Sequence, residues 1–158
     1  MKSLVVYYSR TGNTKFVAEE ITAELGADIE EIVDLKSRGG KLGWFSASRD
    51  GSGNRSTSIA EIKRTPGDYD LIVVGTPVWA WSPCAAIRTY FAKNDLSEKN
   101  VALFFTVDNN PRGAVEKTKK LIPNSNLIGD IVLIKPQMDK EKTKNEIYEW
   151  CISLKSKV

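Results

Sequence analysis

The chain has 158 residues, of which 41% are hydrophobic and 27% are charged. These values are typical of a globular protein, so we expect residues 1–158 to form a single domain. The formal charge of +3 is small, and most Lys and Arg residues are interleaved with Asp and Glu, which argues against nucleic-acid binding. No apolar run approaches the ~20 residues of a membrane span, and no cleavable signal follows Met1, so we expect a cytoplasmic protein without membrane contact.

The chain contains two cysteines and no histidine. Cys84 and Cys151 are too few and too far apart for a disulfide framework, and without histidine we expect neither a metal site nor a histidine-based catalytic triad. Cys84 precedes a predicted helix, where a thiolate would be stabilised. Its spacing from Arg88 does not match the CxxxxxR loop of cysteine phosphatases, so we assign no catalytic residue. Cys151 is expected in the core.

Apolar runs rich in β-branched residues alternate with helical patterns along the chain. In order, the sequence predicts strands at residues 4–8, 29–35, 71–75, 101–106 and 127–134, of which the second is the weakest. Helices are predicted at residues 14–25, 83–91 and 114–122, and a last helix is marked by Ile147, Trp150, Cys151 and Leu154. Because parallel strands need right-handed crossovers, this order predicts a doubly wound, three-layer α/β fold around a five-stranded parallel sheet.

Residues 36–58 break this alternation because they are rich in Gly and Ser, and we expect a long loop that replaces or precedes the second helix. Trp44 and Phe45 would be its apolar anchors. From residue 36 to residue 64 the basic side chains outnumber the acidic ones: Lys36, Arg38, Lys41, Arg49, Arg55, Lys63 and Arg64 against Asp50 and Glu61. This excess indicates either a solvated loop or a docking surface for an acidic partner or ligand.

In an open parallel sheet, ligands bind beyond the carboxyl ends of the strands, where the connections change direction. The first turn there carries three hydroxyls, an amide and a glycine, in the run Ser9, Arg10, Thr11, Gly12, Asn13 and Thr14. These groups, with the free amides of the helix start, suit a phosphate. The alternative is an ordinary helix cap. Because GxxxxGK(S/T) and GxGxxG are missing, a monophosphate fits better than a triphosphate or a dinucleotide.

The second turn places two indoles at the end of a central strand, in the run Thr76, Pro77, Val78, Trp79, Ala80 and Trp81. Large flat side chains suit a flat ligand, and aromatic stacking adds ~1 kcal/mol beyond the burial of area. We favour Trp79 as the stacking residue, because Trp81 lies just before a predicted helix and is a candidate to pack beneath it.

The third turn is polar and leads into the next predicted helix. Its residues offer amides and side-chain acceptors to the edge of a heterocycle: Thr106, Val107, Asp108, Asn109 and Asn110. Asp108 equally suits a plain turn or a helix cap.

The segment SRTGNT resembles the S/T-x-T-G-x-T phosphate loop of flavodoxins. GTPVWAWSPCAAIRTYF is similar to the segment after the third strand in the short flavodoxin-like branch, and LKSRGGKLGWF is similar to a Gly-rich insertion of that branch. The resemblance implies a flavodoxin-like fold with strand order 2-1-3-4-5 and FMN as the cofactor. It also implies phosphate contacts from residues 9–14, ring contacts from residues 77–81 and contacts at the other ring edge from residues 106–110.

The same resemblance implies an electron carrier that works with a redox partner protein, as a monomer or a weak homodimer. Electron carriers of the family are usually strongly acidic, whereas this chain is slightly basic. Two alternatives stay open. An FMN-dependent NAD(P)H quinone or flavin reductase would use the basic residues between positions 36 and 64 to hold a dinucleotide phosphate, and a cofactor-free scaffold would not need the phosphate loop.

Overall fold

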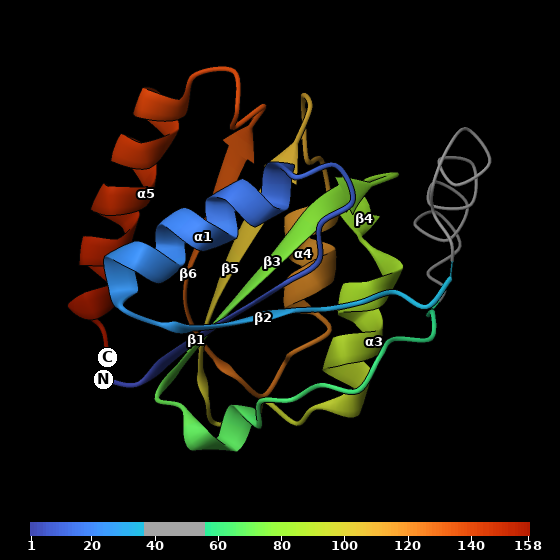
Figure 1. Cartoon of the computed structure of the whole chain (residues 1–158). Helices are drawn as coiled ribbons and strands as arrows, with labels where there is room; N and C mark the ends of the chain where they lie inside the picture. Colours follow the sequence, from blue (N-terminus) through green and yellow to red (C-terminus); the bar gives the residue numbers. More distant parts are fainter. Residues whose placement is uncertain (37–55) are drawn as a thin grey trace.

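A computed structural model describes residues 1–36 and 56–158 (Figure 1). Its centre is a parallel sheet of five strands: β1 (Ser3–Tyr7), β2 (Asp28–Glu31), β3 (Leu71–Trp79), β5 (Asn100–Val107) and β6 (Asn126–Ile134). A short strand, β4 (Ser82–Pro83), pairs antiparallel with the end of β3. The parallel strands lie in the order β2-β1-β3-β5-β6, which is the predicted order 2-1-3-4-5 when the short β4 is left out of the numbering. The predicted fold class and strand order are therefore confirmed.

Helices cover both faces of the sheet. α1 (Asn13–Leu25) and α5 (Lys140–Lys155) pack against each other on one face, and α3 (Ala85–Lys93) and α4 (Ala114–Lys119) lie on the other (Figure 1). A short 3-10 helix, η1 (Pro66–Asp68), leads into β3. Every residue of β1 is buried, and so are the first six of β3. Because helices cover both faces, these strands are continuous apolar runs rather than alternating ones.

The edge strand β2 is shorter than the predicted strand 29–35. It ends at Glu31, after which Val33 and Leu35 are 54% and 63% exposed. A later segment covers its outer edge instead of another strand: the Arg64 side chain donates to the Ile29 carbonyl at 3.1 Å, and an isolated antiparallel bridge joins Asp34 to Ile59. An edge covered in this way is protected from pairing with other chains.

Two other predicted elements differ from the structure by more than two residues at one end. The predicted helix 114–122 ends at Lys119, and the predicted strand 71–75 continues to Trp79, because its last two residues pair with β4. Most of the predicted loop 36–58, including its anchors Trp44 and Phe45, lies outside the described part of the chain.

Close packing between β3 and β5 requires a glycine at position 75. Gly75 and Phe104 are partners in the parallel register of these two strands. A Cβ atom at position 75 would overlap the ring of Phe104, which is itself fully buried. The aromatic ring therefore occupies the space that any other residue at position 75 would need.

We expect Gly75→Ala to destabilise the protein, because neither the strand nor the ring can move away without disturbing the core. Overpacking of this kind typically costs ~1–3 kcal/mol, which urea denaturation would detect as a lower midpoint at an unchanged m-value. Gly67→Ala is the matched control, since its added Cβ would meet only Thr65 Cγ2 at 3.8 Å. If Gly75→Ala unfolds at the same midpoint as the parent protein, the packing argument is wrong.

Candidate functional site

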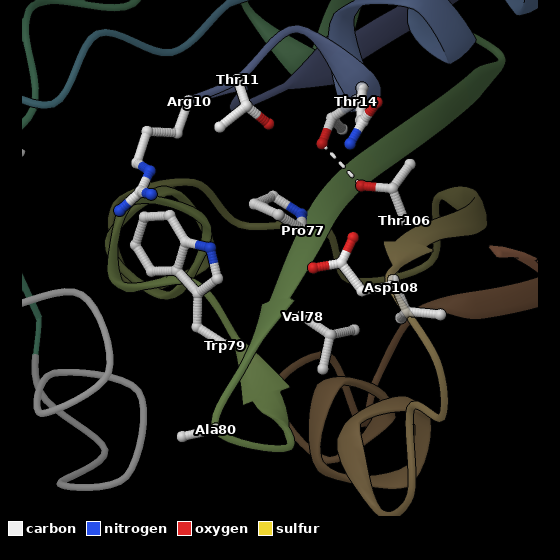
Figure 2. Close-up of a pocket in the computed structure, with 11 residues that line it drawn as sticks. Arg10, Thr11, Thr14, Pro77, Val78, Trp79, Ala80, Thr106 and Asp108 are labelled. Atoms are coloured by element: carbon white, nitrogen blue, oxygen red, sulfur yellow. Dashed lines mark hydrogen bonds between the residues drawn. The ribbon is translucent and has the colours of Figure 1, made fainter. Parts of the chain in front are cut away.

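Three turns meet at the carboxyl edge of the sheet and enclose a pocket of about 240 Å³ (Figure 2). They connect β1 to α1, β3 to α3 through β4, and β5 to α4. The residues that line the pocket all belong to the three predicted turns: Arg10, Thr11, Asn13, Thr14, Pro77, Val78, Trp79, Ala80, Thr106, Val107 and Asp108. The other residues predicted for the site lie in the same turns but do not line the pocket: Ser9, Gly12, Thr76, Trp81, Asn109 and Asn110.

The first turn leaves the start of α1 without a side-chain cap. Gly12 is the N-cap residue; its φ of 93° is a conformation that favours glycine, and it offers no side chain. Ser9 Oγ accepts a hydrogen bond from the Gly12 amide at 3.2 Å instead of capping the helix. The first-turn amides of a 13-residue helix therefore point out of its N-terminus with the helix dipole behind them. This arrangement suits an anion and differs from the ordinary cap that the sequence left as the alternative.

A buried hydrogen bond joins the first turn to the third. Thr14 Oγ1 and Thr106 Oγ1 lie 2.8 Å apart, and the two residues are only 1% and 4% exposed (Figure 2). Each hydroxyl has one hydrogen, so when one of them donates in this bond, the other still has a hydrogen to give to a ligand. Both side chains line the pocket. The pair thus ties two turns together and also presents a donor.

Sequence reasoning missed Gln137, which lies between β6 and α5. Its Nε2 donates to Asn13 Oδ1 at 2.9 Å and so holds the asparagine from outside the pocket. The residue is exposed, and its contact partner is more than a hundred positions away in the chain. No local pattern indicates such a contact, because it depends on how the last crossover packs beside α1.

The second turn is a tight hairpin. Its two loop residues, Ala80 and Trp81, have φ angles of 46° and 57°, as in a type I′ turn, although neither is glycine. Thr76 is buried beneath the hairpin, where its Oγ1 donates to the Pro77 carbonyl at 2.9 Å and accepts from the Cys84 amide at 3.1 Å. Thr76 therefore supports the turn from below and does not line the pocket.

The two indoles have different surroundings. Trp79 lines the pocket (Figure 2). It packs edge to face against Tyr8, with ring centroids 5.5 Å apart. Trp81 does not line the pocket and is 51% exposed, with the Arg112 guanidinium 4.4 Å from its ring centre. The expectation that Trp81 packs beneath the following helix is wrong, because the type I′ turn directs it outward.

The third turn contributes one carboxylate to the pocket. Asp108 is exposed and points into the space between Val78 and Thr106 (Figure 2). Asn110 lies outside the pocket, where its side chain accepts a hydrogen bond from the Arg112 amide at 2.7 Å. Asp108 therefore belongs to the pocket wall, whereas Asn110 shapes the turn.

Neither cysteine has the surroundings of a nucleophile. Cys84 is fully buried, and burial raises the pKa of its thiol to about 11 despite hydrogen bonds and Arg88, which act in the opposite direction. Burial likewise raises the pKa of Cys151 to about 12.

The described residues form no cluster of His, Cys, Asp or Glu side chains that could hold a metal ion. No helix among them is both long and apolar enough to cross a bilayer.

Comparisons with known proteins agree with this architecture. The sequence profile of the flavodoxin family matches residues 2–154. A flavoprotein from Lactobacillus acidophilus, crystallised in complex with FMN, is 27% identical, with 88% of this chain and 97% of that chain covered and a TM-score of 0.73. A protein from Bacteroides eggerthii is 24% identical, with 97% of both chains covered and a TM-score of 0.81. Oxidised flavodoxin 2 from Bacillus cereus is 19% identical, with 100% of both chains covered and a TM-score of 0.64. No curated protein matches the chain significantly.

The doubly wound sheet and the three turns at its carboxyl edge define a flavodoxin-like protein. With a family match over nearly its whole length, the chain belongs to the flavodoxin family.

Proposed function

We propose that this protein binds one FMN in the pocket of Figure 2 and uses it to carry electrons. One observation carries the proposal: the pocket combines an uncapped helix N-terminus with hydroxyl donors at one end and an apolar wall with an indole at the other. A ligand that carries both a phosphate group and a flat ring system needs an anion site and an apolar wall in the same pocket. The FMN complex of the 27% identical flavoprotein from Lactobacillus acidophilus supports the same ligand.

At the phosphate end, neutral groups of this chain would solvate a dianion. The first-turn amides of α1 point at it, Thr11 and Thr14 add hydroxyl donors, and Gly12 allows the backbone to approach closely. A cradle of this kind keeps the phosphate charged without needing a lysine or a metal ion.

At the ring end, the wall of Pro77, Val78, Trp79 and Ala80 would hold the heterocycle and exclude water from one side of it. Bound FMN supplies the redox chemistry by taking up and giving up electrons. Arg10 and Asp108 line the pocket with opposite charges, and each contributes to the electrostatic potential at the ring. The wall residues Trp79 and Ala80 belong to a hairpin that is held by hydrogen bonds and packing, so the ring would meet a preorganised surface.

Two measurements on freshly purified protein test the function. We expect the visible spectrum of a flavoprotein, or its appearance on addition of FMN, and stopped-flow mixing of the FMN form with NADPH should leave the flavin oxidised until a separate reductase protein is added. Rapid bleaching by NADPH alone would identify a reductase instead of a carrier. A colourless protein that does not bind added FMN would leave only the scaffold interpretation.

Thr14→Ala should weaken FMN and spare riboflavin, which lacks the phosphate. Losing a hydrogen bond to a charged group costs ~1.5–3 kcal/mol, which corresponds to about tenfold or more in Kd. Fluorescence titration with both ligands measures the difference. Thr14→Ser is the matched control, because it retains the hydroxyl and with it the bond to Thr106. Equal weakening of both ligands by Thr14→Ala would refute the phosphate assignment.

Trp79→Ala should restore the fluorescence of bound FMN, because a stacked indole quenches the flavin, and should weaken binding about fivefold or more through the lost aromatic contact and buried area. Trp79→Phe should retain most of the affinity. Trp81→Ala is the control from the same hairpin, because this indole is half exposed and does not line the pocket. An unchanged emission in Trp79→Ala, with circular dichroism showing an intact fold, would place the ring against other residues.

A further inference from the structure

Four exposed basic residues lie in the turns and at a helix start on the carboxyl edge of the sheet. Arg10 lines the pocket, and Arg112 lies over the Trp81 ring at the adjoining turn. Lys117, near the start of α4, donates from Nζ to the Trp81 carbonyl at 3.1 Å. Lys135 follows β6, and its amide donates to the last residue of β5 at 2.8 Å. All four residues are exposed at the carboxyl edge of the sheet, and we call Arg10, Arg112, Lys117 and Lys135 the basic rim.

Some carboxylates of the neighbouring turns and helices have other partners. Asp108 lines the pocket, whereas Glu116 forms an ion pair with Lys119 at 3.3 Å and Asp139 is held as the cap of α5. Within residues 1–36 and 56–158, no ion pair involves a residue of the basic rim. Among the residues that the structure describes, the four basic side chains of the rim therefore keep their charge without an ion-pair partner.

Two basic side chains of α5, which lies farther around the same molecule, form ion pairs. Lys144 contacts Glu20 of α1 at 3.0 Å, and Lys142 lies 3.8 Å from Glu146 one turn along the helix. Pairs of this kind cancel each other's field at a distance, whereas the charges of the basic rim, which have no ion pair within the described part of the chain, add to one another.

An apolar anchor stands among these charges. Trp81 is 51% exposed, yet it is held from two sides, by the Arg112 guanidinium over its ring and by the Lys117 ammonium at its backbone. A side chain that is already ordered loses little entropy when a partner covers it. Exposed Trp next to Arg is also the composition from which interface hot spots are built.

We propose that the basic rim and Trp81 form the docking surface for an electron-transfer protein whose own redox centre is surrounded by carboxylates. The inference rests on the proposed function, since it assumes that electrons leave or enter through the mouth of the pocket. A partner must sit over the mouth to come close to the cofactor, and opposite charges around both centres would steer it there. Such redox encounters are small and short-lived, so one anchor and a charged ring suffice.

The test uses the full chain loaded with FMN and two protein probes of opposite charge. The first is an acidic 2Fe–2S ferredoxin, which in its reduced form gives one electron to the oxidised flavin. The second is basic cytochrome c, which takes one electron from the reduced flavin. Stopped flow measures both second-order rate constants at low salt of about 0.01 M, where the Debye length is ~30 Å, and at about 0.1 M, where it is ~10 Å.

We expect the ferredoxin reaction to slow as salt is added and the cytochrome c reaction to show the opposite trend. Arg112→Glu combined with Lys117→Glu should slow the ferredoxin reaction about tenfold or more at low salt and much less at high salt. Arg112→Gln is the milder variant if the double variant does not fold. Trp81→Ala should slow the reaction at both salt concentrations, because its contact is apolar. Lys93→Glu, at the far end of α3, is the matched control and should react like the parent protein.

An FMN titration of each variant keeps this proposal separate from the proposed function. Failure of the parent chain to bind FMN would refute the function itself. If the rim variants bind FMN normally but react with ferredoxin as fast as the parent protein, the docking surface is wrong. The docking-surface proposal is also overturned if Lys93→Glu slows the ferredoxin reaction as much as the rim variants do, or if only the cytochrome c reaction slows with added salt. Burial of Trp81 in a dimer of this chain would overturn it as well.

Discussion

The ring of Phe104 packed over Gly75 is the contact on which the site depends. The two residues are partners in the parallel register of β3 and β5, and this register also sets Pro77 beside Thr106. A slip by one residue would turn every side chain of β3 to the other face of the sheet and would leave the ring without its space. Because the register cannot slip, the carboxyl ends of β3 and β5 have fixed positions relative to each other. The turns that follow them therefore meet the first turn around one pocket.

The Thr14–Thr106 hydrogen bond completes this arrangement from the other side. It joins the start of α1 to the end of β5 across the floor of the pocket, in a place from which water is excluded. A hydrogen bond in such surroundings is stronger than one at the surface, and an unpaired hydroxyl there would be costly. One pair of side chains thus contributes both to stability and to the shape of the phosphate end.

Unfavourable backbone conformations gather at the same edge of the sheet. Among the described residues, five with a side chain have a positive φ, and four of them follow β3, β5 or β6: Ala80, Trp81, Arg112 and Lys135, with Glu98 as the exception. Positive φ is costly for such residues and persists only where the surroundings enforce it. Here the hairpin pairing, the Arg112 contact and the Lys117 hydrogen bond supply that enforcement. The local cost coincides with the pocket and with the surface that we propose for docking.

The sequence by itself determined the layered α/β fold and the three turns that meet at the pocket, and the family resemblance of its motifs supplied the strand order. Runs such as the all-buried β1 favour a covered parallel sheet, and a strand followed by a polar, glycine-containing turn and a helix places that turn at the carboxyl edge. Only the tertiary structure decided the rest. The exposure of Trp81 depends on a tight hairpin, and the loop of this hairpin lacks the glycine by which such a turn is usually recognised in a sequence. The contact of Gln137 with Asn13 joins parts of the chain that are far apart in the sequence. The Cys84 thiol is a third case. Its place at a helix start favours the thiolate, but burial disfavours the thiolate more strongly, and the local sequence does not reveal that burial.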